Sequence, residues 1–314
     1  MAFQKMHKPD YPPRHWSIVG YPSSGKTTFA AQMRGPKLVI DADHRFTEVL
    51  DLDGDDVYAL SDNPADNVDP DAIGRILEAN MPGSGVKTIV VDSLTAIITP
   101  FVVQAMVDRQ KGRAKNLMAA FQKKALAMRQ LQDAVTRWGT DSLWIYHLQD
   151  SRDANAASVV RSTVSQTEIA RLTRSINLQL QVVEDGGRRG IQVIWARRGR
   201  CGITVWDDVG MWVGMPEKLE AAIYDGLTQN EQANIEAKTP KVFPNSETAI
   251  SWGFEQEIFP SIEAARRVYM ALKLEASPRS AREMAALWVA EVRTRQAAEP
   301  LADEPLAADL RKAG

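Results

Sequence analysis

The sequence has a single cysteine, Cys201, and it lacks any apolar run long enough for a membrane helix. One cysteine excludes an intrachain disulfide, and we interpret Cys201 as a structural thiol in a reducing compartment. A membrane-spanning helix needs about 18 apolar residues, and no stretch of this chain approaches that length. Residues 1–16 are polar, contain three prolines and lack the apolar core of a secretory signal. We therefore expect a cytoplasmic protein without a membrane partner.

The chain also lacks a large net charge of either sign. Its 314 residues are 44% hydrophobic and 25% charged, and the formal net charge is -2. This composition is typical of globular proteins, and the length allows one large domain and a smaller one. A nearly neutral total excludes binding to nucleic acid by overall charge, so any DNA contact must come from a local basic patch.

Short apolar runs alternate with helical patterns over the first part of the chain. The runs that predict buried strands are residues 16–20, 38–41, 57–60, 88–92 and 142–146. The helical patterns cover residues 25–33, 73–79 and 97–138. Residues 150–167 show no clear period, and we expect them to form a mobile loop. Alternating strands and helices predict a mostly parallel sheet.

The segment after residue 170 has a different pattern. Residues 176–184 and 191–196 flank Asp185-Gly186-Gly187, which predicts an antiparallel hairpin, and residues 203–205 could add one more strand. We therefore predict an α/β fold, with a mostly parallel sheet, helices on both of its faces and an antiparallel edge.

Composition changes near residue 230 suggest a second, smaller unit. We predict an α/β core over residues 1–229 and a polar linker with two prolines over residues 230–245. A small helical domain is expected over residues 246–296, with Ser261 as one helix cap and Ser280 as another. The tail, residues 297–314, is rich in Ala, Glu, Asp and Pro, and we expect it to be disordered.

The first apolar run leads directly into a phosphate-binding motif. The motif G-x-x-x-x-G-K-[ST] is filled by Gly20, Tyr21, Pro22, Ser23, Ser24, Gly25, Lys26 and Thr27, and Thr28 follows it. Its glycines let backbone N–H groups point at phosphate oxygens, Lys26 brings a positive charge, and Thr27 can ligate Mg²⁺. A strand before the motif and a helix after it argue against an ordinary glycine-rich turn. We therefore predict that ATP and Mg²⁺ bind here.

A second acidic position supports this assignment. Asp92 ends the buried run 88–92, and an acid at such a strand end can reach the magnesium shell beside a phosphate loop. Many strands end in aspartate, so the pattern alone is weak. The preceding phosphate motif makes a turn aspartate the less favoured interpretation, and we predict Thr27 and Asp92 as the magnesium ligands.

With these two motifs the chain resembles the RecA family of P-loop ATPases over residues 16–212. The resemblance implies a water-activating acid after the second strand, where this chain has Asp43 in place of the family's glutamate. Asp43 equally fits the acidic surface of residues 41–71, which has eleven acids and one arginine. His147, at a strand end where the family senses the γ-phosphate, is similar to the histidine of phage Sak-type annealing ATPases. Arg197 matches the family's basic residue that contacts a neighbouring subunit's nucleotide, although an exposed basic turn or a DNA contact remains open.

The resemblance also implies contacts with single-stranded DNA and self-association into a ring or filament. Seven lysines and arginines, with no acid among them, lie between Arg109 and Arg129, which is where relatives place a first DNA loop. Residues 150–167 occupy the position of a second. We predict phosphate contacts by five residues: Lys111, Arg113, Lys115, Arg152 and Arg161. A solvated basic helix face with a disordered loop is the alternative interpretation.

Three functions remain open at this point. The favoured one is an ATP-hydrolysing RecA-like protein that acts on single-stranded DNA in phage-type recombination or annealing, with phage recombination or replication proteins as further partners. The second is a nucleotide-switched assembly factor, such as a helicase loader or a KaiC-like regulator, whose partner is a protein. The third, a helicase motor, is weakened because no strand-separation element is recognisable.

Overall fold

The structure is a computed structural model that describes residues 9–52, 54–113, 121–152, 158–229, 231–232, 243, 245–278 and 281–298. The chain divides into two compact units, unit 1 over residues 1–231 and unit 2 over residues 232–314. Most of the expected linker and nearly all of the expected tail lie outside the described residues. Among the described helices, none combines the length and apolar character needed to cross a membrane.

Unit 1 is built on one nine-stranded sheet. Its strand order is β3-β2-β4-β5-β1-β7-β8-β9, and β6 pairs with β5. The strands are β1 (His15–Gly20), β2 (Lys37–Asp41), β3 (Val57–Ala59), β4 (Thr88–Asp92), β5 (Asp141–Arg152), β6 (Ser158–Ser162), β7 (Leu178–Asp185), β8 (Arg188–Ala196) and β9 (Thr204–Trp206). Strands β1 to β5 and β7 pair in parallel, while β6, β8 and β9 are antiparallel to their neighbours. This sheet confirms the predicted α/β fold class, a mostly parallel sheet with an antiparallel edge.

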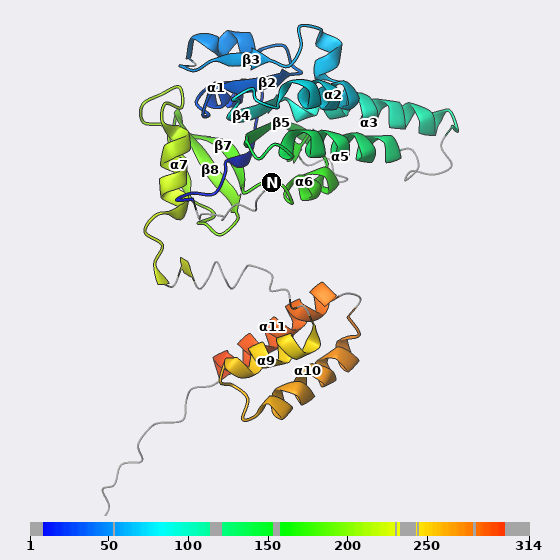
Figure 1. Ribbon diagram of the computed structural model, residues 1–314, viewed down its shortest axis with the longest axis vertical. Coiled ribbons are helices and arrows are strands. Elements are labelled where there is room, and N and C mark those ends of the chain that lie inside the picture. Colours follow the sequence, from blue (N-terminus) through cyan, green and yellow to red (C-terminus); the bar gives the residue numbers. More distant parts are fainter. Residues whose placement is uncertain are drawn as a thin grey trace, which may run out of the picture. The chain divides into compact units, whose positions relative to one another are not determined.

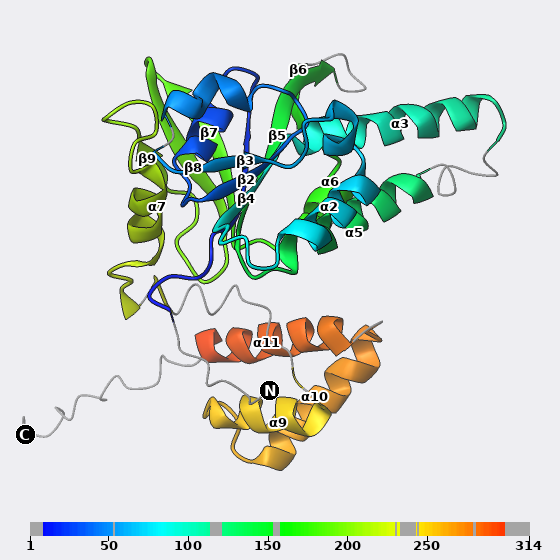
Figure 2. The same ribbon diagram turned by 45° about the horizontal axis from the view of Figure 1, so that its top comes forward.

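Helices cover both faces of the sheet (Figures 1 and 2). One face packs against α2 (Pro70–Asn80), α3 (Leu94–Gln110), α5 (Gln122–Thr136) and α6 (Gln166–Leu172). The other face packs against α1 (Lys26–Ala31), α7 (Met215–Tyr224) and the 3₁₀ segment η1 (Phe46–Leu52). A second 3₁₀ segment, η2 (Pro64–Asn67), precedes α2.

The alternation of side chains in the central strands explains the two layers. Trp16 and Ile18 of β1 join the core on the α1 side, whereas Val19 joins the core on the α2 side. Every residue of β4 is buried, as expected for a parallel strand with helices on both faces. The continuous apolar runs in the sequence therefore correspond to the central strands, which are buried on both faces of the sheet.

Two segments differ from their predictions. The helical pattern over residues 97–138 forms two helices, α3 and α5, which project together beyond the sheet in both ribbon views (Figures 1 and 2). The expected loop over residues 150–167 is wrong, because β5 continues to Arg152 and pairs with β6, and α6 begins at Gln166. Pairing between β5 and β6 supplies the backbone hydrogen bonds that local sequence period did not reveal.

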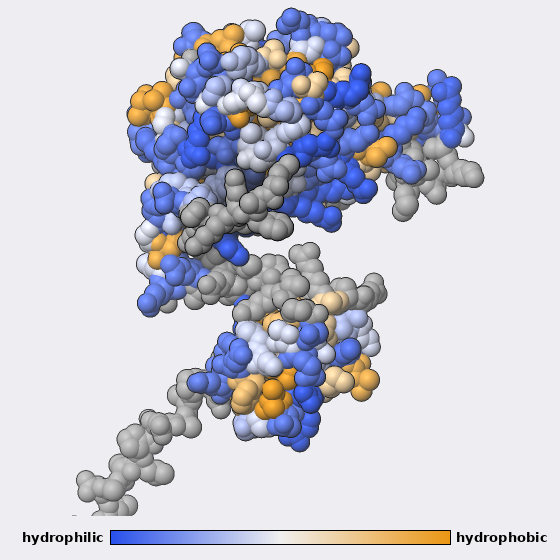
Figure 3. Space-filling model, viewed as in Figure 1, coloured by the Kyte–Doolittle hydropathy of each residue, from blue (hydrophilic) through white to orange (hydrophobic). Residues whose placement is uncertain are grey.

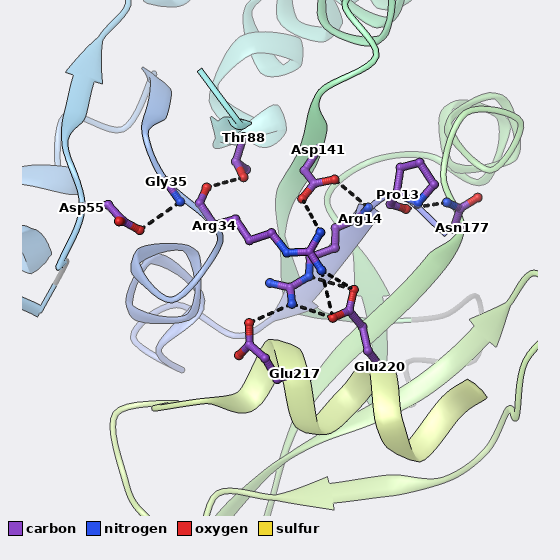
Figure 4. A network of polar contacts seen from close by, with 10 residues as sticks. All are labelled: Pro13, Arg14, Arg34, Gly35, Asp55, Thr88, Asp141, Asn177, Glu217 and Glu220. Atoms are coloured by element: carbon purple, nitrogen blue, oxygen red, sulfur yellow. Dashed lines mark hydrogen bonds and ion pairs between the residues drawn. The ribbon is translucent and has the colours of Figure 1, made fainter. Parts of the chain in front are cut away.

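A buried ion network holds the amino end of β1 against α7 (Figure 4). Arg14 is only 1% exposed and donates hydrogen bonds of 2.6 and 2.9 Å to Glu220 and one of 2.8 Å to Glu217. Arg34 also donates to Glu220, at 3.1 Å, and lies 3.7 Å from Asp141. A buried charge is tolerated when it is paired in this way, so the network joins β1, α7 and the start of β5.

Unit 2 has its own hydrophobic core. It contains three described helices, α9 (Ser246–Glu255), α10 (Ile262–Ala276) and α11 (Ala281–Ala298), of which α9 was not predicted. Trp288 is fully buried and stacks on Phe259. Ser261 caps α10 by accepting a hydrogen bond of 3.1 Å from the backbone N–H of Ala264, as predicted. Ser280 lies outside the described residues.

Candidate functional site

The predicted site residues lie where the central parallel strands end. Gly20, the last residue of β1, pairs in register with His147 of β5. Asp41 of β2 pairs with Asp92 of β4 in the same way. The carboxyl ends of β1, β2 and β4 therefore meet beside His147, the residue at which the parallel pairing of β5 with β1 ends. Ligands bind at this edge of the sheet in open α/β folds.

The phosphate loop, residues 20–27, joins β1 to α1. Gly25 has φ +89°, and a Cβ atom on it would lie 2.8 Å from Nε1 of Trp212. Both features require glycine at this position. The same Trp212 Nε1 donates a hydrogen bond of 2.9 Å to the carbonyl oxygen of Gly25. A tryptophan far away in sequence thus fixes the backbone of the phosphate loop.

Lys26 is held inside the loop that it belongs to. Its Nζ donates to the carbonyl oxygens of Gly20 and Tyr21, at 3.1 and 2.6 Å, and it is only 4% exposed. Burial lowers the pKa of Lys26 to about 8, although the charges of Asp92 and Asp43 oppose this shift. A cation enclosed by carbonyl oxygens, next to backbone N–H groups at the start of α1, suits a phosphate.

Thr27 and Asp92 are in direct contact. Thr27 Oγ1 donates a hydrogen bond of 2.7 Å to Oδ2 of Asp92, which is 3% exposed. Burial raises the pKa of Asp92 to about 6, and the hydrogen bond from Thr27 counteracts part of that shift. Within the described part of the chain, no group of three or more His, Cys, Asp or Glu side chains could hold a metal ion alone. One hydroxyl and one buried carboxylate fit Mg²⁺ that arrives with nucleotide phosphates.

Asp43 and His147 form the next pair along the edge. His147 Nε2 lies 3.3 Å from Oδ2 of Asp43, and the backbone N–H of Asp43 donates to the carbonyl oxygen of Asp92 at 3.2 Å. The hydrogen bond with His147 is the main cause that lowers the pKa of Asp43, while burial opposes it. Asp43 thus stays ionised next to the magnesium pair. Among the described residues, Nδ1 of His147 is buried and has no hydrogen-bond partner.

Arg197 does not join this cluster within one chain. It follows β8, whose last residue, Ala196, pairs with Leu178 at the start of β7. Leu178 pairs in turn with Trp16 near the start of β1, so Arg197 lies at the opposite end of the sheet. Its guanidinium donates to the carbonyl oxygens of Thr173 and Arg174, both at 3.3 Å.

The hairpin turn brings two other arginines to the phosphate-loop end. Arg188 and Arg189 begin β8 and pair with Asp185 and Glu184 of β7, which runs parallel to β1 and continues past its end. Arg188 donates to Asp208 at 3.0 Å. Arg189 is exposed, and its side chain has no hydrogen-bond or ion-pair partner among the described residues. The turn signal Asp185-Gly186-Gly187 could have identified both arginines.

The predicted DNA contacts are distributed over two elements. Lys111 and Arg113 are exposed at the end of α3, with Arg113 3.9 Å from Asp108, and Arg161 is exposed on β6. Lys115 and the side chain of Arg152 lie outside the described residues. One lysine of the basic stretch is not available to solvent, because Lys124 forms a buried ion pair of 3.2 Å with Glu168.

Sequence reasoning missed a link between the phosphate loop and the β5–β6 hairpin. The hydroxyl of Tyr21 donates a hydrogen bond of 2.8 Å to Asp150 near the end of β5. No local pattern indicates this contact, because it joins residues that are 129 positions apart. Trp212 was missed for the same reason.

A comparison with protein families agrees with this geometry. The family model AAA_24, described as an AAA domain, matches residues 13–193, which is more than half of the chain. The chain belongs to this AAA domain family. The match contains the phosphate loop, Asp43, Asp92 and His147, so the residues of the strand-end cluster all lie within the AAA domain.

Two solved structures are similar at low identity. A KaiC-like protein from the hyperthermophilic archaeon Pyrococcus horikoshii OT3 is 16% identical, with a TM-score of 0.37, over 64% of this chain and 88% of that chain. The RadB recombinase is 18% identical, with a TM-score of 0.37, over 62% of this chain and 87% of that chain. With such TM-scores, neither likeness bears on function. No curated protein matches the sequence.

Proposed function

We propose that this AAA domain protein is an ATPase that hydrolyses ATP with Mg²⁺ and acts on single-stranded DNA in phage-type recombination or annealing. The observation that carries the ATPase part is the row of Lys26, Thr27, Asp92, Asp43 and His147 along one edge of the sheet. Lys26 supplies a cation for the phosphates, and Thr27 and Asp92 are in contact as the proposed magnesium ligands. Asp43 supplies an ionised acid, with His147 as its hydrogen-bonding partner.

Each side chain has a distinct part in the proposed reaction. The phosphate loop, with Lys26, binds and orients the phosphates, and Thr27 and Asp92 would hold the ion. Mg²⁺, when bound, neutralises charge on the phosphate oxygens. Asp43 is an ionised acceptor that can take a proton from an attacking water, and His147 orients the carboxylate. Arg197 is proposed to reach the nucleotide of a neighbouring subunit in a ring or filament.

The DNA part of the proposal rests on exposed cations that have few acidic partners. Lys111 lies at the end of the projecting helix α3, and Arg161 lies on β6, close in sequence to the tip of the β5–β6 hairpin. Neither has an ion-pair partner among the described residues. Exposed arginines and lysines without partners bind phosphates by releasing counterions, so a single strand that follows both elements would gain affinity independently of its sequence.

The test measures ATP hydrolysis with and without single-stranded DNA. We expect magnesium-dependent turnover that single-stranded DNA increases. Lys26→Met, which keeps the buried aliphatic stem and removes the cation, should lose nucleotide affinity and turnover. Lys218→Met, on α7, is the matched control and should keep both. Native turnover in the Lys26 variant would refute the ATPase assignment.

A second candidate is an assembly factor with a protein partner, and one observation favours it. Val103 and Met106 on α3 and Leu126 on α5 are each 54% exposed, so the projecting helices carry apolar side chains that a protein could cover. Figure 3 shows a largely hydrophilic surface with hydrophobic residues in small groups. Turnover that DNA leaves unchanged, together with loss of partner binding in Met106→Glu, would support this function over the first.

A further inference from the structure

A cavity of about 700 Å³ opens beside the hairpin of β5 and β6. Its floor is the sheet face formed by β1, β5, β7 and β8, where Val19 and Tyr146 contribute apolar side chains. Its wall consists of Ser162 on β6 and Gln166 and Ile169 on α6. The volume lies within the roughly 300–1,000 Å³ range of ligand pockets. The cavity is separate from the row of phosphate and magnesium residues.

Strand β7 places a pair of amide side chains on this floor. Gln179 and Gln181 alternate with Leu178 and Leu180, which are buried in the core on the opposite face. Gln179 donates a hydrogen bond of 2.7 Å to Thr173. Within the described part of the chain, the amide of Gln181 has no hydrogen-bond partner, although it is only partly exposed. The amide of Gln181 is therefore available to a ligand that enters the cavity, whereas the amide of Gln179 is already paired with Thr173.

The lining restricts the chemistry of that ligand. Among the described residues that line the cavity there is no carboxylate, and Arg161 stands beside it on β6, so a cation is disfavoured and an anionic group nearby is favoured. An amide offers one acceptor and two donor hydrogens in a plane, which matches the edge of a flat, polar ring. Tyr146, Val160 and Ile194 provide apolar surface for the faces of such a ring.

We propose that this cavity takes an unstacked base of a single strand, with Gln181 bonding the base edge and Arg161 the adjacent phosphate. The proposal rests on the DNA part of the proposed function. A polypeptide is the less suitable occupant, because an extended peptide binds through the open backbone of a strand edge. The floor here presents side chains of strands whose backbones are paired with one another.

Oligonucleotides with and without bases test this site. Fluorescence anisotropy compares the affinity of the wild-type protein for a single strand and for an abasic strand of equal length. We expect the strand with bases to bind at least about fivefold more tightly, since unpaired polar groups left in a cavity weaken binding. A 2-aminopurine base within the strand should also change its fluorescence on binding, because it leaves the stack.

Matched variants locate the effect. Gln181→Leu should remove most of the preference for bases and leave the affinity for the abasic strand unchanged, and Gln166→Leu on α6 should reduce the preference. Gln192→Leu is the control, because Gln192 pairs with Gln181 in register but does not line the cavity. Circular dichroism and melting temperature verify that each variant folds.

Three outcomes would overturn the site and leave the DNA part of the proposed function standing. Equal wild-type affinity for both strands would show phosphate binding without a base site. Identical behaviour of the Gln181 and Gln192 variants would place the base elsewhere. A change in sedimentation of Gln181→Leu, with DNA affinity intact, would indicate a polypeptide occupant. Absence of binding to either strand at low salt would instead remove the DNA part of the proposed function, and this site with it.

Discussion

Thr27 Oγ1 donates a hydrogen bond of 2.7 Å to Oδ2 of Asp92, and this contact joins the first turn of α1 to the end of β4. Asp92 is almost fully buried, and its nearest charged neighbours include Asp43 and Asp41, which also raise its pKa. The site therefore encloses a carboxylate whose ionised form is less stable than that of an exposed aspartate. A bound divalent cation would stabilise the ionised form of Asp92. Without a cation, this buried negative charge destabilises the folded state.

Asp92→Asn is expected to stabilise the free protein at neutral pH while it reduces magnesium-dependent hydrolysis far more than nucleotide binding. The pKa of Asp92 is about 6 in the folded chain, against 3.8 for an unperturbed aspartate. Between these values the folded state holds a proton that the unfolded state has released, so the free energy of unfolding falls as pH rises. The ionised form costs on the order of 3 kcal/mol at pH 7.

Urea denaturation without Mg²⁺ or nucleotide measures this effect. The unfolding midpoint of Asp92→Asn should exceed that of the wild type at pH 7, and the two should converge near pH 4. The exposed Asp62→Asn is the control and should follow the wild type at both pH values. A variant that is less stable than the wild type at pH 7 would contradict the assigned burial cost.

Asp43 and His147 should act as one unit in hydrolysis. Asp43→Asn is expected to spare nucleotide binding and to slow the chemical step by roughly 10²–10⁴-fold. His147→Ala should slow it as well, and the double variant should be little worse than the slower single variant, because the two side chains share one function. Single-turnover hydrolysis measures the three rates, and additive losses would refute the coupling.

The pH dependence of His147→Ala tests the same pair independently. The hydrogen bond with His147 lowers the pKa of Asp43, so its removal should raise that pKa. The acid limb of the rate profile should therefore move to higher pH in the variant. An unmoved acid limb would show that another group activates the water.

The edge of the sheet could be predicted from sequence, because each of its elements leaves a local pattern. The residues 88–92 predicted β4 at its observed bounds, and the glycines of the phosphate loop marked the turn before α1. Contacts between distant segments left no such pattern. Residues 158–162, Ser-Val-Val-Arg-Ser, are too short a run to predict a strand alone, and they form β6 by pairing with β5.

The position of Arg197 in the fold could not be predicted from the sequence for a related reason. Its place at the far end of the sheet depends on the register of β7 against β1 and of β8 against β7. Register is fixed by packing across strands, which a single sequence does not display. Trp212 is a similar case, because the loop that precedes α7 places its Nε1 within hydrogen-bond distance of the Gly25 carbonyl oxygen.

The two ends of the sheet lead to a prediction about assembly. If the far end of a neighbouring subunit's sheet faces the phosphate loop, the neighbour's Arg197 lies towards the nucleotide. If the phosphate-loop ends of the two subunits lie side by side, the neighbour's Arg189 lies towards the nucleotide instead. We expect Arg197→Ala subunits mixed with Lys26→Ala subunits to recover turnover, because each supplies an intact half of a shared site. Recovery with Arg189→Ala instead would indicate subunits side by side. Turnover that is independent of protein concentration down to the monomer would contradict a shared site.

The final prediction concerns the basic end of α3. Changing Lys111, Arg113 and Lys115 together to glutamine should weaken binding of single-stranded DNA and leave basal ATP hydrolysis unchanged, because the described members of this set, Lys111 and Arg113, follow the last residue of α3, away from the strand ends. Each lost phosphate contact reduces counterion release, so the slope of log affinity against log salt should shrink by about 0.7 per contact. Sequence preference should not change, because phosphate contacts position a strand and do not specify it.

Two control variants separate this effect from general loss of charge or stability. Arg75→Gln removes an exposed charge from α2 and should leave the salt slope unchanged. Lys124→Gln breaks the buried ion pair with Glu168, so it should lower the melting temperature and leave the slope of the folded protein intact. Fluorescence anisotropy across a salt series measures all three slopes. If the triple variant keeps the wild-type slope, the strand does not follow α3, and the exposed apolar residues of the projecting helices become the better guide to the partner.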